Sequence, residues 1–132
     1  MKVVIDTSAI LAVLLNERHR EKIIDLTRGA ELHAPASLHW EIGNAFSAMF
    51  KQNRLTLEEA DVAIRAYRRI PLRLEEINLK KSLELSWKLG IYAYDAYMLV
   101  CAQQLDAPFI SLDKKLVLAA CGIGIKIREI SE

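Results

Sequence analysis

The sequence predicts a single α/β domain with three layers, in which helices cover both faces of a mostly parallel central sheet. The chain has 132 residues, which is enough for one hydrophobic core. Apolar residues make up 52% of it, as in a globular protein. Short β-branched segments alternate with segments of helical periodicity from one end to the other, and no linker or repeat interrupts them. We therefore expect one domain over residues 1–132.

The first half of the chain begins with KVVID, a β-branched segment that ends at an acidic residue and is typical of a buried strand. Two helical segments follow, over residues 7–17 and 19–29, and Gly29 ends the second. ELHAP predicts another strand, which ends at Pro35. From residue 36 to 52, apolar side chains recur at helical spacing.

The second half continues the alternation. Thr56 and Glu59 form the pattern of a capping box, which predicts a helix that Pro71 ends. LRLEEI predicts a strand, and Asn78 is placed to cap a helix that Gly90 closes. DAYMLVCAQQL is apolar almost all round, which predicts a central, buried helix. The remaining segments predict a buried strand (PFISL), a short helix (DKKLVLAAC) that Gly122 ends, and a final strand (IKIREI).

Acidic residues lie where predicted strands end and predicted helices begin. Asp6 ends the first strand, and Asp113 directly follows the strand PFISL. Asp95 begins the buried helix, and Glu41 lies one turn into the helix that follows ELHAP. Because open parallel sheets bind ligands at the carboxyl ends of their strands, we expect these four carboxylates to share one pocket.

Four carboxylates in one pocket repel one another, so at neutral pH either some of them bind protons or a cation occupies the site. Mg²⁺ and Mn²⁺ prefer such oxygen ligands and can promote phosphodiester hydrolysis. Each acid taken alone also fits a structural role. Asp6, Asp95 and Asp113 lie where helix N-caps are found, and Glu41 suits the dipole at the start of its helix. The predicted metal site therefore depends on the combination.

Four segments resemble the acidic motifs of PIN domains, and their order and spacing are most similar to those of VapC-type toxins of toxin–antitoxin pairs. The segments are VVIDTSAIL, HWEIGNAF, YAYDAYMLVCA and FISLD. The resemblance extends from Val3 to Ile127, although residues 54–86 carry no motif. It implies an endoribonuclease that uses Mg²⁺ or Mn²⁺, with Asp6 and Asp95 as the principal metal ligands and with Asp113 and Glu41 completing the acidic site.

The resemblance also implies supporting roles for polar residues near the acids. Thr7 or Ser8 matches the hydroxyl that follows the first aspartate, and Asn44 matches a polar position beside the site. Ser111 stands where the family commonly has threonine, and it keeps the hydroxyl. Lys114 directly follows Asp113 and is therefore a candidate for contact with an RNA phosphate. Its alternative role is that of an ordinary solvated lysine.

Family members usually form homodimers and are inhibited by a cognate antitoxin, whose C-terminal segment lies across the active site and whose other end binds operator DNA. We expect the same partners here, together with an RNA substrate. No window approaches the roughly 18 apolar residues of a membrane span, and no cleavage site follows the first apolar segment, so we expect a cytoplasmic protein. The net charge of +1 gives no signal for nucleic acid, so any RNA-binding surface is local.

Other interpretations fit the sequence less well. A catalytically silent PIN-fold module that acts through a protein partner is the main alternative. A DNA nuclease of related fold is a further one, and phosphate-accepting or nucleotide-binding domains lack their motifs here. We expect the two cysteines to be buried thiols, the three histidines to have no chemical role, and Trp40 and Trp87 to lie in the core or an interface.

Overall fold

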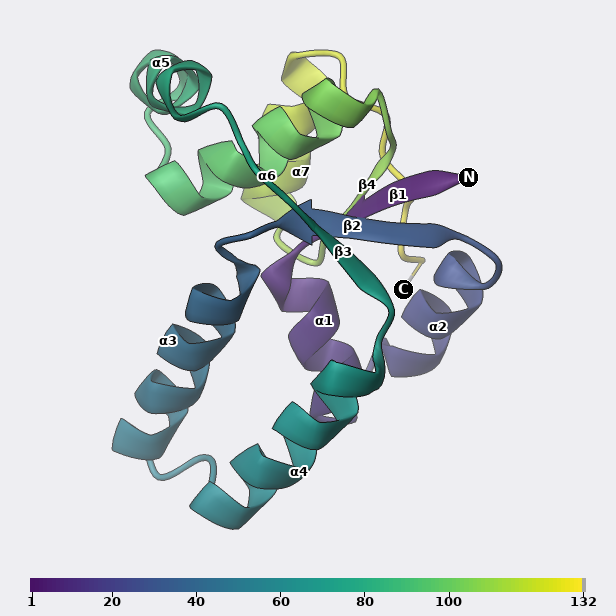
Figure 1. Ribbon diagram of the computed structural model, residues 1–132, viewed down its shortest axis with the longest axis vertical. Helices are drawn as coiled ribbons and strands as arrows, with labels where there is room; N and C mark the ends of the chain where they lie inside the picture. The colour runs from purple at the N-terminus through teal and green to yellow at the C-terminus, as the bar shows by residue number, and fades with distance from the viewer. Residues whose placement is uncertain (132) are drawn as a thin grey trace.

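The computed structural model describes residues 1–131, which form one α/β domain with four strands and seven helices (Figure 1). The strands are β1 (Lys2–Ile5), β2 (Glu31–Pro35), β3 (Leu72–Glu75) and β4 (Phe109–Ile110). The helices are α1 (Thr7–Leu14), α2 (Arg20–Thr27), α3 (Leu38–Lys51), α4 (Leu57–Arg69), α5 (Leu79–Leu89), α6 (Ala93–Leu105) and α7 (Lys114–Gly122).

The sheet is parallel throughout and has the strand order β3-β2-β1-β4. The chain therefore moves outward from β1 to β2 and β3, and then returns to pair β4 with the other edge of β1. The carboxyl ends of β1 and β4 flank the point where the strand order reverses. In open parallel sheets this switch point is where ligands bind.

Helices cover both faces of the sheet, which confirms the predicted three layers. The connections from β1 to β3 place α1–α4 on one face, whereas α5, α6 and α7 lie on the other (Figure 1). The reversal of strand order produces this separation, because right-handed crossovers in opposite directions cover opposite faces.

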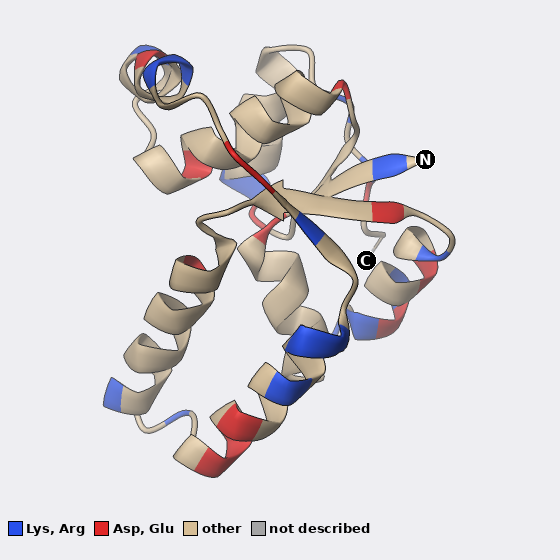
Figure 2. Ribbon diagram, in the orientation of Figure 1, with Lys and Arg blue, Asp and Glu red and all other residues tan. Residues whose placement is uncertain are grey.

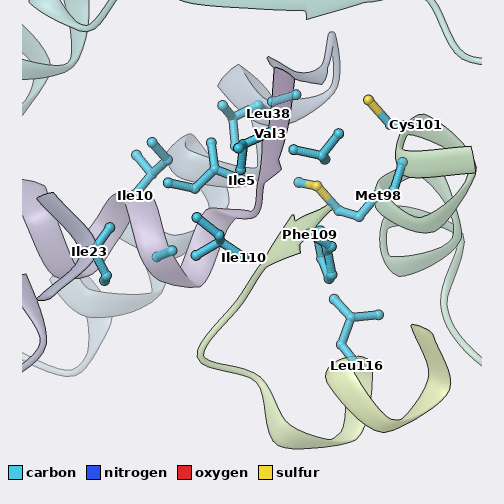
Figure 3. Close-up of a cluster of buried hydrophobic side chains, with 14 of the residues drawn as sticks. Val3, Ile5, Ile10, Ile23, Leu38, Met98, Cys101, Phe109, Ile110 and Leu116 are labelled. Atoms are coloured by element: carbon cyan, nitrogen blue, oxygen red, sulfur yellow. The ribbon is translucent and has the colours of Figure 1, made fainter. Parts of the chain in front are cut away.

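The core consists of β-strand side chains packed between helices of the two layers. Figure 3 shows Ile10 and Ile23, from α1 and α2, on one side of β1, and Met98 of α6 on the other. Val3 and Phe109 are fully buried between them. Burying an aliphatic or aromatic side chain of this size stabilises the fold by about 1.5–3 kcal/mol. The prediction that α6 is a buried central helix is confirmed.

The helix ends follow the capping signals of the sequence. Thr56 and Glu59 form a reciprocal capping box at the start of α4. Asn78 caps α5, and Gly90 closes it in the left-handed conformation (φ 66°). Figure 2 shows acidic residues in the first turns of α4 and basic residues in the last, a distribution that complements the helix dipole.

The predicted final strand is wrong as a regular strand. Among the described residues, only Ile127 of this segment pairs with the sheet, through one parallel bridge to Phe109. The reason is that β4 is two residues long, because the chain then bends to bring Ser111 against β1, and no longer ladder remains to extend. Gly122 is the last residue of α7, as predicted, and the left-handed residue that follows is Gly124 (φ 83°).

One prediction about burial is wrong, and for two tryptophans, which were expected in the core or an interface, the structure excludes the core. Cys101 is buried as expected, but Cys121 is exposed on the outer side of α7. Trp40 and Trp87 are 69% and 88% exposed, so neither lies in the core.

Within residues 1–131, no helix combines the length and the apolar character that a membrane crossing requires.

Candidate active site

The four predicted carboxylates line one cleft of about 260 Å³ at the carboxyl ends of β1 and β4. Asp6 follows β1, and Asp113 follows β4. Asp95 lies in the first turn of α6, and Glu41 in the first turn of α3. The prediction that these side chains meet at one edge of the sheet agrees with this placement, and the cleft coincides with the switch point of the sheet.

Asp6 is the most rigidly held of the four acids. Its Oδ1 accepts hydrogen bonds from the Ser8 hydroxyl (2.7 Å) and the Ala9 amide (3.1 Å), and its Oδ2 accepts one from the Ser111 hydroxyl (2.6 Å). The residue is only 4% exposed. Burial raises the pKa of Asp6 to about 6, and the charge of Asp113 adds to this, although the three donors act against it.

Two serine hydroxyls connect Asp6 to the loop that follows β4. The Ser111 hydroxyl donates to Asp6 and accepts a hydrogen bond from the Asp113 amide (2.9 Å). The Ser8 hydroxyl also donates to Asp6 and accepts one from the Leu112 amide (2.9 Å). Each hydroxyl both donates and accepts, so the backbone at Asp113, though not its carboxylate, is fixed relative to Asp6.

Glu41 is held by two hydroxyls from different helices. The Thr7 hydroxyl donates to Oε1 (3.0 Å), and the Ser37 hydroxyl donates to Oε2 (3.1 Å). Burial raises the pKa of Glu41 to about 7, and the charges of Asp6 and Asp95 raise it further against these two hydrogen bonds. The sequence analysis missed Ser37, although its place four residues before Glu41 at a helix start was a usable signal.

Asp95 and Asp113 are less restrained. Burial, and then the charge of Asp113, raises the pKa of Asp95, and no described residue donates a hydrogen bond to its carboxylate. Asp113 is exposed, and its Oδ1 accepts only the Leu116 amide (3.2 Å) as the N-cap of α7. Since a carboxylate has about four acceptor positions, these two retain the most capacity to bind a cation.

The donor set suits a hard divalent ion, because it consists of carboxylate oxygens. Burial, with a smaller contribution from their mutual charge, raises the pKa of three of them, Asp6, Glu41 and Asp95. In the conformation shown by residues 1–131, however, no three acidic, histidine or cysteine side chains stand close enough together to hold one ion. Binding of one cation by three of these acids would therefore require them to move closer together than they stand here. The less restrained Asp95 and Asp113 are the ones with freedom to do so.

Three of the predicted supporting residues, Asn44, Lys114 and Ser111, are not part of the lining of this cleft. Asn44 is exposed on α3 and is not among the residues that line it. Lys114 lines a neighbouring groove of about 470 Å³. Ser111 is also part of the lining of that groove, so the groove and the acidic cleft lie on either side of the loop after β4.

A second polar cluster, which the sequence analysis missed, lies on β2 and β3. His33 is 2% exposed, and its ring nitrogens contact Glu75 (Nδ1, 2.6 Å) and Glu31 (Nε2, 2.7 Å). The hydrogen bond from His33 lowers the pKa of Glu31, and the nearby Arg73 contributes to the same shift. Glu31 and His33 share a face of β2 because they are two residues apart, but the contact with Glu75 depends on strand register.

Comparison with known proteins agrees with this fold. A PIN domain family model matches residues 3–120. Ribonuclease VapC9 of Mycobacterium tuberculosis is 28% identical over 117 residues, covering 86% of this chain and 87% of that protein. The fold is similar to the crystal structures of PAE2754 from Pyrobaculum aerophilum (TM-score 0.72, 20% identity, 96% of this chain, 83% of that one) and of VapBC2 from Rickettsia felis bound to promoter DNA (TM-score 0.69, 11% identity, 97% and 98%). The family match spans most of the chain, and the chain therefore belongs to the PIN domain family.

Proposed function

We propose that this chain is a Mg²⁺- or Mn²⁺-dependent endoribonuclease and the toxin of a VapBC-type toxin–antitoxin pair, acting in the cytoplasm. The observation that carries the proposal is the acidic cleft at the switch point of the sheet, where four carboxylates from four segments meet. The ribonuclease name of the relative VapC9 supports the same activity. No whole-molecule charge attracts RNA, so a cation in the cleft is needed to offset its repulsion of phosphate.

The residues that hold the cation in this proposal are Asp6, Glu41, Asp95 and Asp113. A divalent ion bound there supplies polarisation of the phosphodiester and helps to ionise an attacking water. Asp6 keeps about one acceptor position after its three hydrogen bonds, so it can supply one ligand oxygen from a fixed position. Asp95 has all of its acceptor positions available to a ligand.

Glu41 contributes a proton-holding group at the edge of the cleft. Because its pKa is raised to about 7, its carboxyl group exchanges a proton near neutral pH. Both of its oxygens face donors that keep the side chain in one orientation. Lys114 directly follows Asp113 and is exposed, so we assign it contact with the RNA phosphate chain.

The proposed partners are a cognate antitoxin that covers the cleft and a second copy of the chain. VapBC2, one of the structures similar in fold, is a complex bound to promoter DNA. For the homodimer, the proposed contact surface consists of exposed apolar side chains on α3, α5 and the start of α6, which a second copy of the chain would shield from water. These side chains are Trp40, Leu79, Leu83, Trp87, Tyr92 and Tyr94.

Asp95→Asn tests the proposal, because it removes the charge of the least restrained carboxylate in the cleft and breaks no hydrogen bond of the fold. We expect RNA cleavage by the purified variant to fall by at least about a hundredfold, as for loss of a group that acts in the transition state. Asp61→Asn, at an exposed position on α4, is the matched control and should leave cleavage unchanged.

Cleavage that persists in Asp95→Asn at the wild-type rate would contradict the proposal. A folded wild-type chain that takes up no Mn²⁺ and cuts no RNA would instead support the catalytically silent binding module.

A further inference from the structure

The hydroxyl of Ser37 has an unusual partner for a residue at the start of a helix. Ser37 occupies the N-cap position of α3, where a serine side chain ordinarily accepts a hydrogen bond from a backbone amide of the first turn. No such capping hydrogen bond is present. Its backbone is helical (φ −65°, ψ −12°) rather than extended, and its hydroxyl donates to Glu41 Oε2 at 3.1 Å. The side chain is therefore directed at an acid of the cleft.

Ser37 and Thr7 together fix the plane of the Glu41 carboxylate. Thr7, at the first position of α1, donates to one oxygen, and Ser37, at the start of α3, donates to the other. A single donor would leave the carboxylate free to rotate about that one contact. Two donors, one on each oxygen, hold the group in one orientation and leave the remaining acceptor positions facing the cleft.

We propose that Ser37 is a positioning residue that orients Glu41 for binding of the divalent ion. The inference rests on the proposed function, since it assumes that Glu41 contributes to a metal site. Hydrogen-bond partners of metal ligands commonly affect metal affinity by about 10- to 100-fold, because they fix the orientation of the ligand. Ser37 does not touch the ion or RNA itself, so its effect reaches the reaction only through Glu41.

The test compares wild type with Ser37→Ala, Ser37→Thr and Ser47→Ala in Mn²⁺ titrations without RNA, with free Mn²⁺ followed by electron paramagnetic resonance. Ser47 is the matched control, because it lies on the same helix and its exposed hydroxyl donates only to a backbone carbonyl. We expect Ser37→Ala to weaken Mn²⁺ binding about tenfold. Ser37→Thr keeps the hydroxyl and should bind within about twofold of wild type, and Ser47→Ala should not differ from it.

Cleavage assays provide a second readout. We expect Ser37→Ala to lower kcat at fixed Mn²⁺ while KM for RNA stays unchanged, and we expect added Mn²⁺ to restore much of the loss. A purely structural role would lower the melting temperature without changing Mn²⁺ affinity.

The outcomes separate this inference from the proposed function. If wild type binds Mn²⁺ and Ser37→Ala binds it equally well, the positioning role is wrong and the nuclease proposal stands. If Ser37→Thr is as weak as Ser37→Ala, the hydroxyl is not the cause and the positioning role is again wrong. If wild type binds no Mn²⁺ at all, both proposals are wrong.

Discussion

Replacing Ser111 by alanine should destabilise the protein in a way that depends on pH. The Ser111 hydroxyl donates to Asp6 at 2.6 Å and accepts the Asp113 amide at 2.9 Å, and both contacts are lost. The residue is 7% exposed, so water does not readily replace the hydroxyl. A hydrogen bond to a charged group is worth about 1.5–3 kcal/mol, and one between neutral groups about 1 kcal/mol. We therefore expect Ser111→Ala to lower the free energy of unfolding by about 2.5–4 kcal/mol above pH 7.

The sign of the pH effect follows from the raised pKa of Asp6. Its folded pKa of about 6 lies above the unfolded value, so Asp6 is largely protonated at pH 5 and charged at pH 8. The Ser111 hydrogen bond stabilises the charged form, and its loss raises the pKa further. The difference in the free energy of unfolding between variant and wild type should thus be about 2 kcal/mol at pH 5, from two hydrogen bonds between neutral groups, and should grow as the pH rises through 6.

Chemical denaturation at pH 5 and pH 8, without metal, measures both values. For a chain of this length, a loss of about 3 kcal/mol at pH 8 corresponds to a melting temperature lower by about 11 °C. Ser111→Thr keeps the hydroxyl and should stay close to wild type, and Ser47→Ala should change the free energy of unfolding by less than about 0.5 kcal/mol. An equal loss at both pH values, or a loss in Ser111→Thr as large as in Ser111→Ala, would refute the reasoning.

Three further predictions concern other parts of the structure. Mn²⁺ affinity should rise at least about tenfold from pH 6 to pH 8, because the carboxyl group of Glu41, whose pKa is raised to about 7, must lose its proton to bind a cation. Calorimetry in buffers of different ionisation enthalpy should show this proton release, and an affinity that does not change with pH would contradict the prediction. His33→Ala leaves Glu31 and Glu75 facing each other without the ring and should lower the free energy of unfolding by about 2 kcal/mol in urea, whereas a neutral result would mean that water replaces the ring. In sedimentation experiments, Trp87→Glu should give a folded monomer, whereas Leu118→Glu, at an exposed position on α7, should leave the proposed dimer intact. A Trp87→Glu variant that remains dimeric would exclude α5 from the interface.

The fold could be predicted from sequence because local signals repeat at every element. The capping box of Thr56, the N-cap Asn78 and the left-handed Gly90 each mark a helix end by local chemistry alone, and each is present as predicted. The final strand could not be predicted in the same way. IKIREI has the composition of a strand, but whether it forms one depends on the length of its partner β4, which is a tertiary property.

In the acidic site, too, some features follow from the local sequence and others depend on tertiary structure. Asp6 and Asp113 follow adjacent parallel strands, so the position of each in the sequence already predicts that they meet. Glu41 was supported mainly by the family resemblance, and the structure places it in the same cleft. The Ser37 contact required knowledge of side-chain direction at the start of α3. The His33 cluster required the register of β3 against β2, which no local pattern encodes.

Burial of ionisable acids in the cleft lowers the stability of the fold. A rise in the pKa of Asp6 from 3.8 to about 6 corresponds to about 3 kcal/mol of lost stability when the carboxyl group is ionised, and the serine hydroxyls offset only part of the burial cost. An N-cap role alone does not require such a cost, because an exposed aspartate would cap α1 equally well. A structural explanation therefore accounts for the hydrogen bond from Ala9 but not for the burial of Asp6 beside three other acids. The proposed divalent cation would account for this burial, because it would stabilise the ionised carboxylates that the fold by itself disfavours.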